Sequence, residues 1–230
     1  MTDSEIVEQA IAFVKETLQG AEGGHDWFHI QRVFKNTLLI AKDEKVDVLV
    51  VSLAALLHDI ADAKFNDGNE TIGPKLAEDF LGALQVKKKI ITHVSKIIKN
   101  ISFKNSLAKK RGRPFNSKEL QVVRDADRLD AMGAIGVARA FNYGGFKNRE
   151  LYNPEIAPNL KMTKEEYKKS TAPTINHFYE KLLLLKDKMH TETGRKLAEE
   201  RHQFMLTYLK QFYKEWDPLA PAKGSAVDGV

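Results

Sequence analysis

The sequence predicts a single all-α domain, and three observations support this. Apolar residues recur at helical intervals along most of the chain, and no strand-like alternation of useful length interrupts them. No linker rich in Gly, Pro or Ser divides the chain. Its 230 residues, 43% of them apolar, are enough to bury a substantial core. We expect the domain to span 1–216 and the Pro-, Ala- and Gly-containing end, 217–230, to be a flexible tail.

The first two helices have recognisable ends. Thr2 and Glu5 have the spacing of a capping box, and the helix that they begin is expected to close at Gly20. Asp26 is a suitable N-cap for a second, long helix that carries a buried stripe. The chain therefore begins with two amphipathic helices separated by a glycine break.

The third helix, 48–57, is apolar on almost every side, which predicts the central buried helix of the fold. Pro74 suits the first turn of a fourth helix, and 86–101 has the apolar spacing of a fifth. The stretch 102–116, with a glycine and a proline, is expected to be a long loop.

The rest of the chain is also expected to be helical. Ser117 begins a helix, and the glycines near 133–136 and 143–145 are expected to interrupt the helical region after it. Two long amphipathic helices, about 172–189 and 192–216, are expected to complete the fold.

Composition excludes several classes of protein. The absence of cysteine rules out disulfides, thiolate metal sites and cysteine nucleophiles. No apolar run approaches the roughly 20 residues that a membrane-spanning helix needs, and the first residues lack the features of a signal peptide. We therefore expect a soluble cytoplasmic protein with no membrane partner.

Positive charge is concentrated between Lys87 and Arg113, where there are ten basic residues and no acidic one. The rest of the chain carries 26 basic and 31 acidic residues, a net charge of −5. Such a segment attracts anions, so it suits phosphate capture or nucleic-acid binding. A solvated helix face that leads into a loop is the simpler interpretation.

The first candidate for chemistry is the pair His58 and Asp59, which ends the apolar helix 48–57. Burying an imidazole and a carboxylate is costly unless each has a partner. A metal ion is one such partner. A His–Asp hydrogen bond, or an Asp that caps the next turn, is the alternative.

The second candidate is Asp127. One face of the predicted helix carries a set of residues at heptad steps: Leu120, Val123, Asp127, Asp130 and Ala134. The pattern selects Asp127 as the inward carboxylate, with Asp130 as a rival, whereas Asp125 falls on a polar face. A surface salt bridge to Arg124 or Arg128 is the alternative role, and it suits Asp125 better than Asp127.

The third candidate is the pair His25 and His29, whose spacing of four residues allows two imidazoles to share a metal on a helix. Because Asp26 is the expected helix start, His25 lies before the first turn. His29 lies beside the buried stripe, where a core histidine with one hydrogen bond is the alternative.

In chain order these segments are specific. They read HIQRV from His29, LLHDI from Leu56 and RDADRLD from Arg124, within the longer strings GHDWFHIQRV, ALLHDIADAKF and VVRDADRLDAMGAIGVARAFNYGG. The chain resembles the HD superfamily of metal-dependent phosphohydrolases over roughly residues 6–212. The longer strings resemble its small single-domain branch, which includes bacterial nucleotide pyrophosphohydrolases.

The resemblance implies a helical bundle around one divalent metal ion, which the sequence identifies only as Mn²⁺, Co²⁺, Ni²⁺, Mg²⁺ or Zn²⁺. It implies four metal ligands: His29, His58, Asp59 and Asp127. Two imidazoles and two carboxylates suit such an ion and leave positions for water and a phosphate oxygen. His25 and His93 are the candidates for additional ligands.

Catalysis and substrate binding are expected from nearby residues. Asp59 acts through the metal, and Asp62 occupies the place of an acidic residue, often Glu, that resembles the general base of HD enzymes. Arg32 is expected to pair with a carboxylate or a substrate phosphate, and Lys64 to bind phosphate or neutralise Asp62. The set expected to contact a polyphosphate is completed by three lysines that lead into the 102–116 loop, which is expected to act as a lid: Lys96, Lys99 and Lys104.

The expected reaction is hydrolysis of a (deoxy)nucleoside triphosphate to the monophosphate and pyrophosphate by a metal-activated water, which makes a nucleotide the expected partner. Nucleoside monophosphate phosphatase and cyclic-nucleotide phosphodiesterase activities use the same metal set. The non-enzymatic alternative is a nucleic-acid-binding protein that uses the basic 87–113 segment. The complete ligand set disfavours that alternative, as does the single phenylalanine, Phe103, in the segment.

Overall fold

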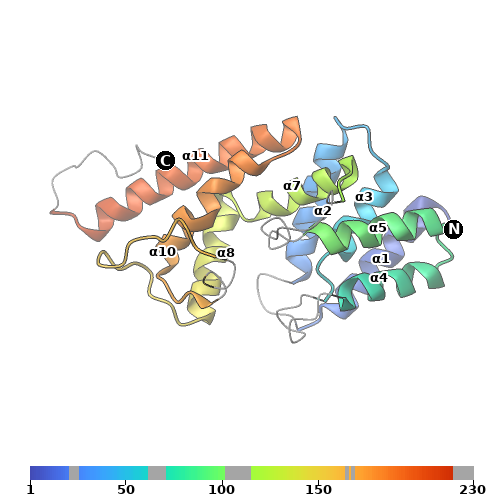
Figure 1. Ribbon diagram of the computed structural model, residues 1–230, viewed down its shortest axis with the longest axis horizontal. Helices are drawn as coiled ribbons and strands as arrows, with labels where there is room; N and C mark the ends of the chain where they lie inside the picture. The colour runs from blue at the N-terminus through green and yellow to red at the C-terminus, as the bar shows by residue number, and fades with distance from the viewer. Residues whose placement is uncertain (21–25, 62–70, 102–114, 164–165, 167–168, 220–230) are drawn as a thin grey trace.

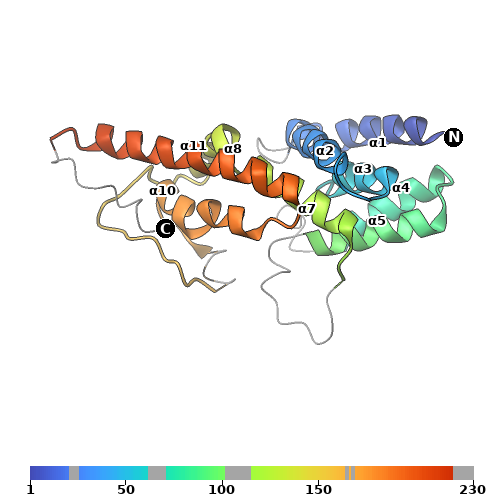
Figure 2. The same ribbon diagram turned by 90° about the horizontal axis from the view of Figure 1, so that it is seen from above.

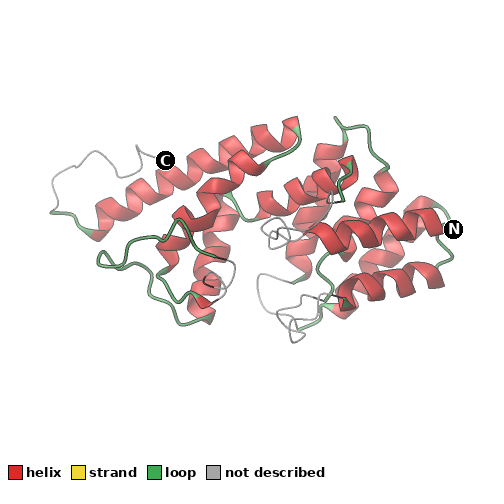
Figure 3. Cartoon of the chain, in the orientation of Figure 1, coloured by secondary structure: helices red, strands yellow, loops and turns green. Residues whose placement is uncertain are grey.

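The computed structural model describes residues 1–20, 26–61, 71–101, 115–163, 166 and 169–219. Within these ranges every regular element is a helix and none is a strand (Figure 3), which confirms the all-α prediction. The α-helices are α1 (Asp3–Thr17), α2 (Trp27–Ala41), α3 (Val48–Leu57), α4 (Ile72–Ala83), α5 (Lys88–Ile101), α7 (Lys118–Asp130), α8 (Gly133–Phe146), α10 (Thr174–His177) and α11 (Glu192–Trp216).

Helix α7 lies in the middle of the molecule (Figures 1 and 2). Helices α1 to α5 gather at one end, and α8, α10 and α11 lie at the other. Helix α7 contacts α2, α3 and α5 on one side and α8 and α11 on the other. The two ends of the fold are therefore joined through a helix that has neighbours on several faces.

The predicted N-caps are confirmed. Thr2 and Glu5 form a reciprocal capping box at the start of α1. The side chain of Asp26 accepts a hydrogen bond of 2.9 Å from the backbone N–H of His29 at the start of α2. Ser117 accepts one of 3.1 Å from Leu120 at the start of α7. Each cap satisfies backbone donors that the first turn leaves without partners.

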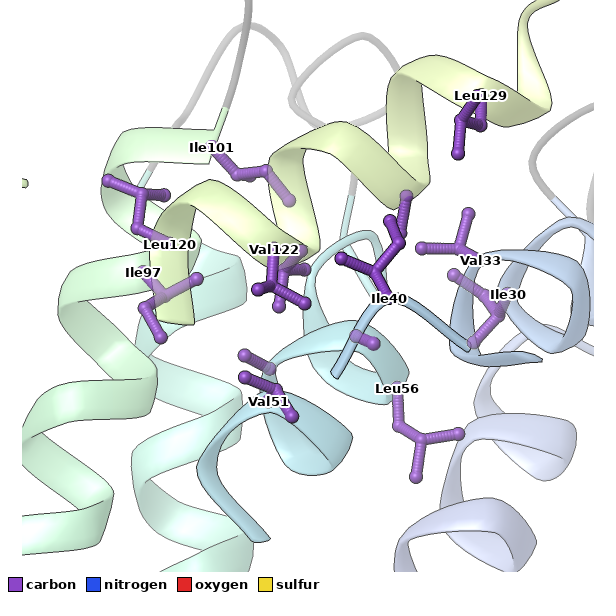
Figure 4. Close-up of a cluster of buried hydrophobic side chains, with 14 of the residues drawn as sticks. Ile30, Val33, Ile40, Val51, Leu56, Ile97, Ile101, Leu120, Val122 and Leu129 are labelled. Carbon is purple, nitrogen blue, oxygen red and sulfur yellow. The ribbon is translucent and has the colours of Figure 1, made fainter. Parts of the chain in front are cut away.

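The core forms around α3, as its apolar sequence predicts, since every residue from Leu49 to Leu57 is buried. Side chains of α2, α5 and α7 surround it (Figure 4). The figure shows the four helices contributing aliphatic side chains to one cluster, which includes Ile30, Ile97, Val122 and Leu56. This packing fixes the end of α3, where His58 and Asp59 follow.

One long helix over 172–189 was the wrong expectation. The structure has the short α10, a π-helical turn at Phe178–Leu182 and a 3₁₀ segment at Leu183–Lys188. Phe178, Leu182 and Leu185 are buried and have the spacing of one α-helical stripe. Leu183, which an ideal α-helix would turn away from that stripe, is buried as well, and the change of helical pitch accompanies its burial.

The expected interruption at 143–145 was also wrong, because these residues lie within α8. At Gly144 a Cβ would overlap the hydroxyl of Thr174, so this glycine permits close packing rather than a turn. The break comes earlier, at Gly133, which has a φ of 68° and separates α7 from α8. Ala134 consequently belongs to α8 and not to the face of α7 on which it was placed.

No helix in the described ranges is long and apolar enough to cross a membrane. Most of the 102–116 segment and most of the 217–230 tail lie outside those ranges, so the expectations for a lid and for a flexible end stay predictions.

We predict that Leu56→Ala lowers the free energy of unfolding by about 2–5 kcal/mol, because its side chain is fully buried and the change leaves a cavity. Leu39→Ala removes the same atoms from a side chain that is 42% exposed, and it should cost less than about 1 kcal/mol. Urea unfolding of both variants measures the difference. Equal losses would contradict the placement of the core.

Candidate metal centre

Four side chains from three parts of the chain bring polar atoms together. Ligand-type atoms of His29, His58 and Asp59 all lie within 4.8 Å of one another. Asp127 Oδ1 is 3.6 Å from His29 Nε2 and 3.8 Å from His58 Nε2. Asp59 Oδ2 is 3.9 Å from His29 Nε2. The structure thus groups the four residues that the resemblance implied as ligands.

Each member of the group is placed by a helix end or a buried helix. His29 lies in the first turn of α2, where its backbone is held by the Asp26 cap. His58 is the C-cap of α3, so the packing of that helix determines its position. Asp127 lies in the last turn of α7. Its side chain is 37% exposed and gives the group an opening to solvent, whereas that of His29 is 3% exposed.

Hydrogen bonds fix which imidazole nitrogen faces the group. The carbonyl of Ala55 can only accept, so His58 Nδ1 donates to it, at 2.8 Å. His29 Nδ1 donates to Asp130 Oδ2 at 2.7 Å. Both Nε2 atoms therefore present a lone pair to the shared space, which is the state that binds a metal ion.

Burial lowers the pKa of His29, although the hydrogen bond to Asp130 opposes the shift. A lowered pKa keeps this imidazole neutral near pH 7, because the protonated form is disfavoured in a buried place. The donor set consists of two imidazoles and two carboxylates, and it fits a divalent cation.

Asp130 supports the group from behind. Its Oδ1 accepts from Arg32 Nε at 2.6 Å, and its Oδ2 accepts from Arg139 Nη1 at 2.8 Å. Burial raises the pKa of Asp130, but the hydrogen bonds from His29 and Arg32 and the charge of Arg139 outweigh it and hold the pKa well below its usual value. The pattern's choice of Asp127 as the inward carboxylate was therefore wrong: Asp130 is the buried one, and it is the ionised partner of His29.

Of the two arginines that hold Asp130, one was a candidate from the sequence and the other was not. Arg32 was expected to pair with a carboxylate or a phosphate, and in the structure its guanidinium holds Asp130. Arg139 was not singled out from the sequence. It lies one helix further along, and no local pattern relates it to a carboxylate nine residues earlier.

The placement of Asp125 on an exposed polar face was wrong. Its side chain is fully buried, and Oδ2 accepts hydrogen bonds of 2.8 Å from the backbone N–H and the hydroxyl of Thr191. Both of its oxygens also accept from the backbone of His190. Asp125 joins α7 to the N-terminus of α11. A pattern with one apolar and one polar face could not predict the burial of Asp125, because other helices pack against α7 on both sides.

Three other candidates make contacts of their own. His93 Nε2 lies 3.0 Å from Ser117 Oγ and 3.5 Å from a carboxylate oxygen of Glu119. Lys99 forms an ion pair of 3.5 Å with Glu78 on α4, and Lys96 lies over the ring of Phe115. Within the described part of the chain, none of the three belongs to the group around His29.

The remaining candidates lie outside the described residues: His25, Asp62, Lys64 and Lys104. Their roles as additional ligand, general base and phosphate-binding groups stay predictions.

Comparison with known proteins places this geometry in a family. The model of the HD domain matches residues 27–132, which include all four members of the group. The protein YpgQ of Bacillus subtilis is 39% identical over 219 residues, which are 94% of this chain and 96% of YpgQ.

Solved structures agree with this match. An HD-superfamily hydrolase from Bacillus thuringiensis has a TM-score of 0.74 and 41% identity, and the alignment covers 94% of this chain and 99% of that one. The structure of B. subtilis YpgQ in complex with ADP also has a TM-score of 0.74, with 35% identity, and the alignment covers 98% of this chain and all of that one. The chain therefore belongs to the HD domain family, the superfamily of metal-dependent phosphohydrolases.

Proposed function

We propose that this protein hydrolyses a (deoxy)nucleoside triphosphate to the monophosphate and pyrophosphate, with one divalent metal ion held by His29, His58, Asp59 and Asp127. The observation that carries the proposal is the convergence of two imidazole Nε2 atoms and two carboxylates at the meeting point of α2, α3 and α7. Two carboxylates gathered beside buried imidazoles carry a free-energy cost, and a cation offsets that cost.

The hydrogen-bond partners of the two imidazoles orient their Nε2 atoms for binding a metal ion. Asp130 and the Ala55 carbonyl fix the donor face of each imidazole, and a ligand held in this way loses little freedom when it binds. When bound, a divalent ion supplies Lewis-acid catalysis, because it acidifies water and polarises a phosphoryl oxygen. The partly exposed Asp127 lies on the open side of the group, from which a substrate would approach.

The sequence supplies the candidate for proton transfer. Asp62 follows Asp59 by three residues, which is one turn if the helical path continues. We propose that its carboxylate accepts the proton of the attacking water. A carboxylate is a suitable base for this step provided that it lies within hydrogen-bonding reach of the water.

The choice of a nucleotide rests on the family branch and on one relative. YpgQ, which is similar to this chain over nearly its whole length, has been solved in complex with ADP. A substrate with a phosphoanhydride matches the metal-dependent phosphohydrolase chemistry of the superfamily.

The activity is tested by a screen of the purified protein against nucleoside tri-, di-, mono- and cyclic phosphates with Mn²⁺, Co²⁺ and Mg²⁺. We expect turnover of triphosphates with release of pyrophosphate, and none after chelation. Release of orthophosphate from monophosphates, or opening of cyclic nucleotides without attack on triphosphates, would contradict the proposed reaction.

A pair of substitutions separates metal binding from proton transfer. Asp59→Asn should lose both the ion and the activity, because it removes a ligand. Asp62→Asn should keep the ion and lose about 10²–10⁴-fold in turnover, the usual contribution of a general base. Elemental analysis and steady-state kinetics measure the two properties. Full activity in Asp62→Asn would show that the base lies elsewhere.

A second pair tests the role of Asp130. Asp130→Asn leaves all four proposed ligands in place but removes the carboxylate that orients His29, so affinity for Mn²⁺ should fall by about 10–100-fold. Asp125→Asn is the matched control, because it alters another buried carboxylate of α7 that contacts none of the four. It should lower the melting temperature and keep the metal affinity of the wild type. Titration of the metal-free proteins with Mn²⁺ measures the affinities. Equal losses of Mn²⁺ affinity in the two variants would contradict the role of Asp130 in orienting His29.

A further inference from the structure

An open surface cavity, separate from the candidate metal centre, lies where α7 meets the start of α11. Its volume is about 610 Å³, and it is lined by one face of α7, by residues 187–190 and by Arg195. None of the four residues proposed to hold the metal ion lines it. Figure 1 shows the beginning of α11 close to α7 at this place.

The lining is strongly basic. Four cationic side chains face the cavity from three elements: Arg124, Arg128, Lys188 and Arg195. Among the lining residues Asp187 is the one carboxylate, and the buried Asp125 lies beneath it. Outside the lining, Asp127 interacts electrostatically with Arg128 and Glu192 with Arg195. The side chain of Asp187 is 74% exposed, and its carboxylate lies 3.7 Å from the ammonium group of Lys186. Lys186 does not line the cavity. The lining itself therefore carries four cationic side chains and one carboxylate.

The buried carboxylate does not account for these cations. Of the four, only Arg128 comes within 4 Å of Asp125, at 3.9 Å. The oxygens of Asp125 already accept hydrogen bonds from His190 and Thr191. The N-terminus of α11 is capped by the hydroxyl of Thr191, which accepts from the N–H of Gly194, so the helix end is not itself the binding feature.

Two of the guanidinium groups are held in place by neutral partners. Arg124 Nη2 donates to the carbonyl of Asn100 at 2.7 Å, and Arg195 Nη1 donates to the carbonyl of His190 at 3.0 Å. Within the described part of the chain neither forms an ion pair. Each guanidinium has five N–H donors in a planar fork, so most of them remain for another acceptor. That fork matches the oxygens of phosphate groups.

We propose that this cavity binds a small phosphorylated anion, either free pyrophosphate or the diphosphate of a nucleotide. The cavity has room for more than one phosphate group, and the negative charges of phosphate oxygens complement the four cationic side chains of the lining. Binding here needs no metal ion, because arginines supply the positive charge. The proposal is therefore independent of the hydrolytic reaction.

The test titrates metal-free full-length protein with pyrophosphate by calorimetry at about 150 mM salt, where weak surface attraction is screened. Without metal, the centre at His29 should contribute little to the signal. We expect one site, weakened at least about tenfold in Arg124→Gln/Arg195→Gln, since each change removes charge-assisted hydrogen bonds. The single variant Arg195→Gln should be intermediate, and it changes an exposed side chain that donates to backbone carbonyls.

The control is Lys210→Gln/Lys214→Gln. It removes the same charge from exposed positions on α11, about 22 Å or more along the helix from Arg195. This variant should bind pyrophosphate as the wild type does. No binding to the wild type, or equal weakening in the two double variants, would overturn the proposal. Tighter binding of a short RNA than of pyrophosphate would also overturn it.

Two further measurements complete the assignment. Titration with ADP identifies the source of the diphosphate: tighter binding than pyrophosphate supports a nucleotide, and equal binding supports the free ion. Nucleotide hydrolysis by the metal-loaded Arg124→Gln/Arg195→Gln variant should match the wild type in kcat. A protein that fails to hydrolyse nucleotides but still binds pyrophosphate would disprove only the proposed function.

Discussion

The carboxylate of Asp130 is bound at once by a histidine of α2, an arginine of α2 and an arginine of α8. A buried charge is tolerated only with several such partners, and the loss of one leaves the rest uncompensated. The same contacts that neutralise Asp130 hold three helices in register. They also fix the proton of His29 on Nδ1, so that Nε2 faces His58, Asp59 and Asp127. A change at Asp130 is therefore expected to affect both the stability of the fold and the geometry of the site.

Helix α7 concentrates the polar contacts of the molecule. Asp127 and Asp130 contribute to the candidate metal centre, and Asp125 accepts hydrogen bonds from Thr191, the N-cap of α11. Arg124 and Arg128 face the basic cavity. An isolated amphipathic helix offers one polar face to water, but a helix between two groups of helices must satisfy polar groups on several sides. Side chains and backbone groups from both ends of the chain supply hydrogen-bond partners for the polar side chains of α7. As a result, the two ends of the molecule are joined by charged contacts as well as by apolar packing.

Much of the architecture could be predicted from short stretches of sequence. Thr2, Asp26 and Ser117 cap the helices that they were expected to cap, because a cap depends on a backbone turn only a few residues long. The apolar helix 48–57 is the buried centre, since no polar face allows it to lie anywhere else. The order of His29, His58, Asp59 and Asp127 indicated a group that the structure assembles. Their role as metal ligands stays a prediction.

Tertiary structure alone decided the rest. Asp130 and His29 are 101 residues apart, and the partner of each polar group at such a separation is set by packing rather than by any local pattern. The burial of Asp125 and the role of Arg139 follow from the neighbours of α7, which its own periodicity does not reveal. The π and 3₁₀ turns at 178–188 accompany the burial of Leu183, which an ideal α-helix would turn away from the stripe of Phe178, Leu182 and Leu185. Local sequence therefore determined which helices form and where most of them begin, and packing determined which polar groups meet.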